Sequence, residues 1–163
     1  MGGDAGLEVT VPGAIAFLQQ KTDVRLMMVG DESQVKSALT AAQAPMDRID
    51  IIHASQVVEM DEAPQLALKN KKDSSMRVAI NQVKEGQAQA AVSAGNTGAL
   101  MATARFVLKT IPGIERPAIA KFMPSPHDDH MTLMLDLGGN VDCTAEQLVQ
   151  SAVLGSELVQ ALY

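Results

Sequence analysis

Three short segments of the chain combine glycines with polar side chains, and each could bring an anion against the backbone. The first is Met1–Asp4, in which a glycine pair precedes the carboxylate of Asp4. Paired glycines let backbone N–H groups approach an anion, and an acid can orient a nucleophile or a proton. A tight turn accounts for the same residues, so the sequence leaves both interpretations open.

The second segment runs from Ser93 to Gly98, between a predicted strand and a long predicted helix. A helix N-terminus presents free N–H donors and the positive end of the helix dipole, which makes phosphate a natural ligand. The side chains of Ser93, Asn96 and Thr97 could add donors beside Gly95 and Gly98. An N-cap followed by a turn explains Asn96 and Gly98 without any ligand. The segment matches neither the P-loop pattern nor the dinucleotide-binding fingerprint.

The third segment, 136–142, follows a predicted strand and places two acids and an amide around a flexible turn. Asp136 and Asn140 are its candidate functional side chains. A turn capped by an Asx side chain is the structural alternative, and the residues alone do not separate the two.

Cationic side chains gather at 69–77, beside the start of another predicted helix at Ser74 and Ser75. Such a group could hold an anionic ligand or an acidic protein partner. A charged face exposed to solvent is the alternative. The cationic residues are Lys69, Lys71, Lys72 and Arg77.

Two further segments contain residues that can bind metals or act as nucleophiles, but their spacing argues against both roles. His127 and His130 flank two aspartates, and residues so close in sequence do not converge easily on one ion. We therefore expect a polar loop and no metal site. Cys143 has no Cys or His at motif spacing, which favours an inert thiol. A lone cysteine cannot form an internal disulfide, so we expect a reducing compartment.

The composition bounds the class of protein. The chain has 163 residues, enough for one domain with a core, and 47% of them are apolar while only 2% are aromatic. The core must therefore consist of Ala, Val, Ile, Leu and Met. A net charge of -6 argues against general nucleic-acid binding, which needs a basic surface. No pattern of a signal peptide or a membrane span is present, so we expect a cytoplasmic protein.

The hydrophobic pattern alternates short apolar runs with longer helical stretches. The runs predict strands at 25–29, 49–53, 90–93 and 131–136, with a weaker candidate at 118–122. Strands that alternate with helices form a mostly parallel sheet. Ligands of such sheets bind outside the carboxyl ends of the strands, where the three segments described above lie.

The apolar stripes between these runs predict four helices. The first begins at Pro12, and the second is capped by Asp73 or Ser74 and stopped by Gly86. The third carries a stripe from Leu100 to Ile111. The last opens with a capping box, Thr144 and Gln147, and its expected buried face consists of Leu148, Ala152, Val159 and Leu162.

Strings of residues that match one known family follow one another along the chain. They are Met1–Asp4, Val9–Ala14, Val29–Asp31, His53–Ser55, Lys71–Met76, Ser93–Leu100, Arg116–Ala118 and Leu135–Cys143. Together these strings resemble the PlsX-type phosphate acyltransferases of bacteria. The resemblance spans essentially the whole chain.

The resemblance implies an α/β fold of three α/β/α layers with a mostly parallel sheet, like that of isocitrate and isopropylmalate dehydrogenases, in a homodimer. It implies transfer of the acyl group of acyl-acyl-carrier-protein to inorganic phosphate, which yields acyl-phosphate for bacterial phospholipid synthesis. Family members are cytosolic and associate peripherally with the membrane. Compared with them, residues 1–163 are expected to lack a first apolar strand and a C-terminal half, and Leu7 stands where the family commonly has Pro.

Phosphate is already anionic, so we expect it to attack directly, without a cofactor or a protein nucleophile. We assign catalysis to Asp4 and Asp136, which orient donors or manage a proton, and to Asn140, which donates to an oxyanion. The acidic carrier protein is expected to dock on the cations at 69–77. The expected phosphate ligands are Ser74, Ser75, Ser93, Gly95, Asn96, Thr97 and Gly98.

Two alternatives to this function remain. A phosphotransacetylase-like enzyme that uses acyl-CoA shares the chemistry, but it would need a nucleotide pocket for which the sequence has no clear motif. A non-catalytic fragment that pairs with a partner through a surface rich in Met and Ala is the other.

Overall fold

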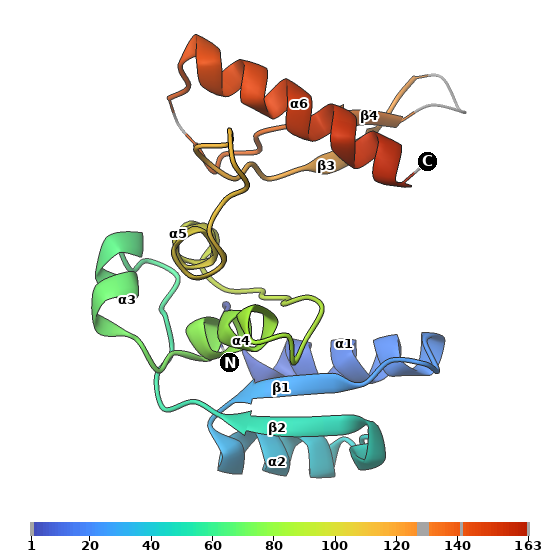
Figure 1. Cartoon of the computed structure of the whole chain (residues 1–163). Coiled ribbons are helices and arrows are strands. Elements are labelled where there is room, and N and C mark those ends of the chain that lie inside the picture. The colour runs from blue at the N-terminus through green and yellow to red at the C-terminus, as the bar shows by residue number, and fades with distance from the viewer. Residues whose placement is uncertain (1, 127–130, 141, 163) are drawn as a thin grey trace. The chain divides into compact units, whose positions relative to one another are not determined.

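The computed structural model describes residues 2–126, 131–140 and 142–162, and Figure 1 shows the order of their helices and strands. The described residues form two compact units, Met1–Leu108 and Lys109–Tyr163. The elements are α1 (Leu7–Gln20), β1 (Leu26–Gly30), α2 (Glu32–Ala41), the 3-10 helix η1 (Met46–Arg48), β2 (Ile49–His53), α3 (Pro64–Asn70), α4 (Ser75–Lys84), α5 (Thr97–Leu108), β3 (Lys121–Pro124), β4 (Met131–Met134) and α6 (Ala145–Leu162).

A parallel pair of strands forms the sheet of the first unit. β1 and β2 pair with Leu26 opposite Ile49 and Gly30 opposite His53, which confirms the strands predicted at 25–29 and 49–53. α2 joins the two strands and contacts both of them. The core beside this sheet is built from Val11, Leu18, Val35, Leu39 and Ile49.

The first helix begins earlier than predicted. α1 starts at Leu7, so Pro12 lies inside the helix and not at its first position. A proline inside a helix removes one backbone hydrogen bond. Leu7 and Val11 precede the proline, Ile15 and Leu18 follow it, and all four pack into the same core. Burial of this face therefore offsets the lost hydrogen bond.

One guanidinium joins the end of α1 to the start of β2. Arg48 of η1 donates hydrogen bonds to the backbone carbonyls of Leu18, Lys21 and Val24. The last carbonyls of a helix have no partner inside the helix. Arg48 supplies donors to this end of α1 and to the loop that leads into β1.

A second core of the same unit lies among α3, α4 and α5 (Figure 1), and its buried side chains are Val58, Ala67, Met76, Ile80, Ala99 and Val107. α4 begins as predicted, because Ser74 is the N-cap and its Oγ accepts a hydrogen bond from the N–H of Arg77 at 3.3 Å. Gly86 follows the end of α4 with a positive φ of 72°, the conformation expected of a glycine stop.

Two further predictions for this unit are wrong. Residues 90–93 are not a strand: no described residue forms a β-ladder with them, and Val92 is 96% exposed. An apolar run needs neighbouring strands to form a ladder, and the sheet of this unit consists of β1 and β2. The third helix is shorter than its predicted stripe, because α5 ends at Leu108 and leaves Ile111 exposed outside it.

The second unit contains an antiparallel pair of strands. β3 and β4 pair with Lys121 opposite Met134 and Pro124 opposite Met131. Both predicted strands exist with shifted bounds, but their pairing departs from the predicted parallel sheet. The segment between Pro124 and Met131 is too short for the crossover that parallel strands require. The α/β class is confirmed, with one parallel and one antiparallel pair among the described residues.

The last helix begins as predicted but packs differently. In α6 the Oγ1 of Thr144 accepts from the N–H of Gln147 at 3.3 Å, and the Oε1 of Gln147 accepts from the N–H of Thr144 at 3.2 Å. This is the predicted capping box. Gly155, three residues after Ala152 and on the same face of α6, meets Leu133 and Leu135, but the predicted burial of the side chains on this face is wrong. The four side chains expected to be buried are exposed: Leu148, Ala152, Val159 and Leu162.

We predict that Arg48→Met lowers the free energy of unfolding by about 2 kcal/mol, since it removes charged hydrogen bonds to several carbonyls. Urea titration of the chain measures this change. Arg25→Met is the matched control, because the exposed Arg25 guanidinium pairs with Asp50 at 3.2 Å, and such pairs contribute less than about 1 kcal/mol. Equal losses in the two variants would contradict the role of Arg48.

Candidate functional site

Two of the segments that the sequence singled out lie against each other in the first unit. A Cβ added at Gly3 would lie 2.7 Å from the carbonyl oxygen of Ala94, and one added at Gly95 would lie 3.7 Å from the backbone nitrogen of Gly3. Gly3 has a φ of 80°, which a side chain rarely adopts. The glycine pair is therefore required for the backbone at 2–4 to reach the loop at 93–98.

The N-terminal loop also rests on the segment that follows β2. A Cβ added at Gly2 would lie 3.8 Å from Cγ1 of Val57 and 3.8 Å from the carbonyl oxygen of Val58. Asp4, two residues after Gly2, is exposed. Asp4 is therefore accessible to solvent, in a loop whose glycines pack closely against neighbouring segments.

The start of α4 reaches the same place, but its serines are buried. Ser74 is 2% exposed and Ser75 is 6% exposed. The Ser74 hydroxyl caps α4, and the N–H of Ser75 donates to the carbonyl of Gln56 at 3.0 Å. Met76, the second residue of the helix, has its Cε 3.5 Å from a Cβ added at Gly95. The helix start thus supports the 93–98 loop from below the surface.

The 93–98 loop contains the cap of α5. The Oδ1 of Asn96 accepts a hydrogen bond from the N–H of Ala99 at 2.9 Å, so the N-cap interpretation of Asn96 is confirmed. The Oγ of Ser93 accepts from the N–H of Gly95 at 3.1 Å, which closes the turn before the cap. Thr97 is exposed in the first turn of α5. A Cβ at Gly98 would lie 3.0 Å from Cγ of Pro64, so this glycine allows α5 to meet the start of α3.

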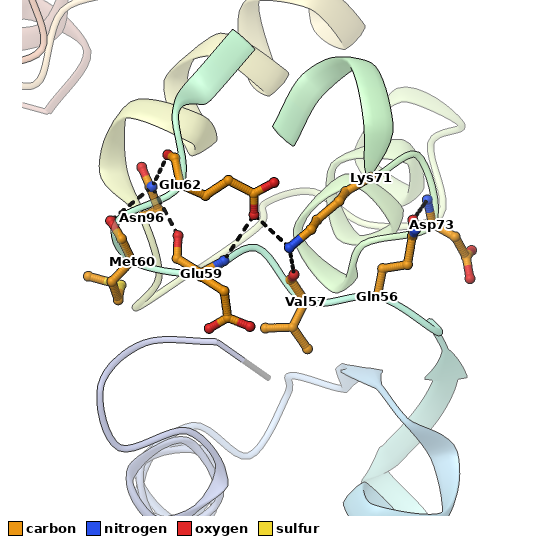
Figure 2. A network of polar contacts seen from close by, with 8 residues as sticks. All are labelled: Gln56, Val57, Glu59, Met60, Glu62, Lys71, Asp73 and Asn96. Carbon is orange, nitrogen blue, oxygen red and sulfur yellow. Dashed lines mark hydrogen bonds and ion pairs between the residues drawn. The ribbon is translucent and has the colours of Figure 1, made fainter. Parts of the chain in front are cut away.

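The side-chain amide of Asn96 also holds a distant loop. Its Nδ2 donates to the carbonyls of Glu59, Met60 and Glu62 at 3.1, 3.0 and 2.9 Å, as Figure 2 shows. The Asn96 residue is only 7% exposed. An amide nitrogen has two hydrogens, and here they serve three acceptors. Asn96 therefore has no spare donor for a ligand in this structure and acts by holding backbone.

Lys71 forms a second set of contacts with the same loop. Its Nζ lies 2.6 Å from Oε2 of Glu62 and donates to the carbonyl of Val57 at 2.6 Å (Figure 2). The same carboxylate oxygen accepts from the N–H of Glu59 at 3.3 Å. The hydrogen bond from Lys71 is the largest influence on the Glu62 carboxyl and lowers its pKa. These contacts occupy the ammonium group that the sequence assigned to docking.

The other three cations of the 69–77 segment differ in exposure. Lys69 and Lys72 are exposed, as docking residues must be. Arg77 is half-buried, and its guanidinium carbon lies 5.0 Å from the centroid of the Phe106 ring. Cations over aromatic faces are held by the ring quadrupole. Lys69 and Lys72 therefore remain the accessible pair.

Sequence reasoning assigned no functional role to polar residues at the carboxyl ends of β1 and β2, or to Asp73, which it treated only as a candidate helix cap. Asp73 accepts from the hydroxyl and the N–H of Ser55 through Oδ2, and these hydrogen bonds lower the pKa of the Asp73 carboxyl. Asp31 caps α2, and hydrogen bonds from the Ser33 side chain and the Gln34 backbone lower its pKa. His53, which ends β2, adds a smaller electrostatic contribution to both shifts. For Asp31 and Ser55, a place just after a predicted strand was the signal that could have found them, whereas Asp73 follows no predicted strand.

The third segment lies in the second unit, and there Asp136 and Asn140 contact each other. Nδ2 of Asn140 donates to Oδ2 of Asp136 and to the carbonyl of Pro117 at 3.1 Å. Oδ1 of Asp136 accepts from the N–H groups of Ile119 and Gly139 at 3.0 and 3.2 Å. Partial burial raises the pKa of the Asp136 carboxyl, but these hydrogen bonds outweigh it and lower the pKa overall. Asp136 is therefore an ionised hydrogen-bond acceptor at neutral pH.

The two remaining candidates are a possible nucleophile and a possible metal-binding segment. Cys143 is exposed and not in a disulfide. The segment 127–130, for which we predicted a polar loop, lies outside the described residues. Across residues 2–126, 131–140 and 142–162, no group of three His, Cys, Asp or Glu side chains is arranged to hold a metal ion. Within the same ranges no helix has both the length and the apolar character needed to cross a membrane.

Comparison with known proteins gives consistent matches. The chain matches the family model described as "Fatty acid synthesis protein" over residues 1–163. It is 80% identical over 163 residues to a phosphate acyltransferase of Neisseria meningitidis serogroup B, a match that covers 100% of this chain and 46% of that protein. Proteins of the same name from Chromobacterium violaceum and Legionella pneumophila are 66% and 54% identical, over 99% of this chain and 47% of each protein. The chain thus spans about half the length of the curated relatives it matches.

We predict that Gly3→Ala destabilises the chain more than Gly86→Ala. Both glycines have positive φ, 80° and 72°, so both variants carry a backbone cost of about 1 kcal/mol. Only Gly3 has a carbonyl oxygen where the new methyl group would lie, which should add ~1–3 kcal/mol. Chemical denaturation measures both, and equal destabilisation would argue that the loops at 2–4 and 93–98 do not pack as described.

Proposed function

The chain belongs to the fatty acid synthesis protein family, and we propose that it is part of an enzyme that transfers a fatty acyl group from acyl carrier protein to inorganic phosphate. The observation that carries this proposal is the match, over essentially the whole chain, to proteins named phosphate acyltransferase at 54% to 80% identity. The product is an acyl-phosphate, an activated acyl group for phospholipid synthesis.

The proposed reaction needs little covalent help from the protein. A phosphate oxygen attacks the thioester carbonyl carbon, and the resulting oxyanion collapses as the carbon–sulfur bond breaks. The acyl group then lies on phosphate, and the sulfur takes a proton to leave as the free carrier thiol. Because phosphate is already an anionic nucleophile, the main contributions are orientation of the two reactants and stabilisation of the oxyanion.

We propose that phosphate binds where the N-terminal loop meets the 93–98 loop. The glycine backbones of the two loops approach each other closely, and Thr97 is exposed at the N-terminus of α5, where helix N–H groups favour an anion. Asp4 lies exposed beside them and can orient a proton of the phosphate. In this proposal Ser74, Ser75, Ser93 and Asn96 hold the loops, since their described contacts are with backbone groups.

Within the second unit, we propose that Asp136 and Asn140 act as a hydrogen-bonded pair. The lowered pKa of Asp136 makes it an acceptor that orients donors and not a general acid at neutral pH. Both described donor contacts of the Asn140 amide go to oxygens of Pro117 and Asp136, so the pair fixes the loop at 136–140. A contact of Asn140 with the oxyanion would require one of these hydrogen bonds to be exchanged.

The proposal extends to the whole enzyme. We propose a three-layer α/β/α fold like that of isocitrate and isopropylmalate dehydrogenases, assembled as a homodimer. A cytoplasmic enzyme of this kind would associate peripherally with the inner face of the membrane, where its acyl-phosphate product is used. The matched relatives, about twice as long as this chain, support placing these properties in the full-length protein.

An assay of acyl-phosphate formation tests the proposed reaction. A full-length protein that contains this chain is incubated with palmitoyl-carrier protein and phosphate, and the acyl-phosphate is trapped with hydroxylamine. We expect product that depends on phosphate, with the carrier-bound donor strongly preferred over palmitoyl-CoA. Preference for palmitoyl-CoA would favour a phosphotransacetylase-like enzyme, and absence of product with either donor would refute the proposal.

We predict that Lys69→Glu combined with Lys72→Glu raises the KM for acyl carrier protein several-fold, since both lysines are exposed and the partner is acidic. The salt dependence of this KM should fall in the variant. Lys36→Glu with Lys84→Glu gives the same change in net charge at other exposed positions and should have a much smaller effect. Equal effects of the two double variants would rule out a docking site at 69–72.

A further inference from the structure

The segment between β2 and α3 is held from two sides by side chains of other elements (Figure 2). On one side, the Nζ of Lys71 bridges the carbonyl of Val57 and the carboxylate of Glu62, each at 2.6 Å. On the other, the amide of Asn96 donates to three carbonyls at 59–62. We call residues 57–62 the clamped segment.

The clamped segment is the surface on which the N-terminal loop rests. Gly2 approaches Val57 and Val58, and Gly3 approaches Ala94 in the loop that Asn96 caps. Both contacts are made by glycine backbone, which has no side chain to adjust. A small displacement of residues 57–58 or of Ala94 therefore changes where the N-terminal loop can lie. The position of the N-terminal loop, which includes Asp4, therefore depends on where the clamped segment lies.

Lys71 is bound tightly enough to set that position. The Lys71 and Glu62 side chains are only 25% and 17% exposed, and Glu62 also accepts from the N–H of Glu59 at 3.3 Å. Breaking a partly buried ion pair by removing one partner leaves the other charge without compensation. Loss of the lysine would also leave the Val57 carbonyl without this charged donor.

We infer that Lys71, together with Glu62, is a positioning residue for phosphate: it sets the place of the Gly2–Asp4 loop against the 93–98 loop without touching the substrate. This inference rests on the proposed function, since it concerns the same site. It gives Lys71 a role different from the docking role proposed for Lys69 and Lys72. The difference follows from their contacts, because Lys71 pairs with Glu62 whereas Lys69 and Lys72 are exposed.

Steady-state kinetics of the full-length protein test this inference. Lys71→Met removes the charge and the donors, Lys71→Arg keeps a cation that can reach both oxygens, and Lys36→Met is the control at an exposed lysine elsewhere in the unit. For Lys71→Met we expect the KM for phosphate to rise on the order of tenfold, because misplacing a binding loop by about an ångström has effects of this size. The kcat at saturating phosphate should change far less.

A merely structural role would give a different result. Destabilisation alone lowers the thermal midpoint and the amount of active enzyme, and so kcat, without moving the KM for phosphate. An unchanged KM in Lys71→Met, whatever happens to kcat or the midpoint, would overturn the inference, as would a rise equal to that of Lys36→Met. A raised KM that Lys71→Arg largely restores supports it. Failure of the unchanged enzyme to make acyl-phosphate is a separate outcome, and it refutes the proposed function first.

Discussion

The first unit depends on the burial of one amide group. Asn96 is almost fully buried, and a buried amide must have its donors and acceptor satisfied or the fold loses stability. Here the acceptor caps α5 and the donors bind the carbonyls at 59–62, so one side chain fixes both the start of a helix and a loop far away in sequence. Gly2 and Gly3 approach these two segments closely, and Met76 contacts the segment that contains Asn96.

The second unit uses the same physical device with a different residue. The Asp136 carboxylate accepts from the N–H groups of Ile119 and Gly139 and from the Asn140 amide, whose other described contact is the Pro117 carbonyl. In each unit, a polar side chain beside a glycine-containing loop satisfies backbone groups that no strand or helix can satisfy. Polar residues that look like ligands in the sequence, such as Asn96, Asp136 and Asn140, thus bind backbone groups in the described structure.

Sequence reasoning succeeded where the signal was local. The strands at 25–29 and 49–53, the Ser74 cap, the Asn96 cap and the Thr144–Gln147 capping box depend on residues within a few positions of one another. Sequence reasoning failed where contacts with residues distant in the sequence determine the structure. The apolar run at 90–93 has no neighbouring strand in the described structure, and the apolar stripe of α6 stays exposed although Gly155, on the same face, meets Leu133 and Leu135. Periodicity identifies an apolar face but does not say how much of that face a partner covers.

The sequence by itself determined the family, the α/β class and the segments that carry polar chemistry, since each of these is written in residue types at short spacing. It did not determine what each polar side chain does. Lys69, Lys71 and Lys72 are equivalent in the sequence, but only Lys71 meets both the Glu62 carboxylate and the Val57 carbonyl in the described structure. Likewise, Asn96 serves as a clamp because carbonyls more than thirty positions away converge on it. The free energy of these contacts depends on distance and burial, and only the tertiary structure sets both.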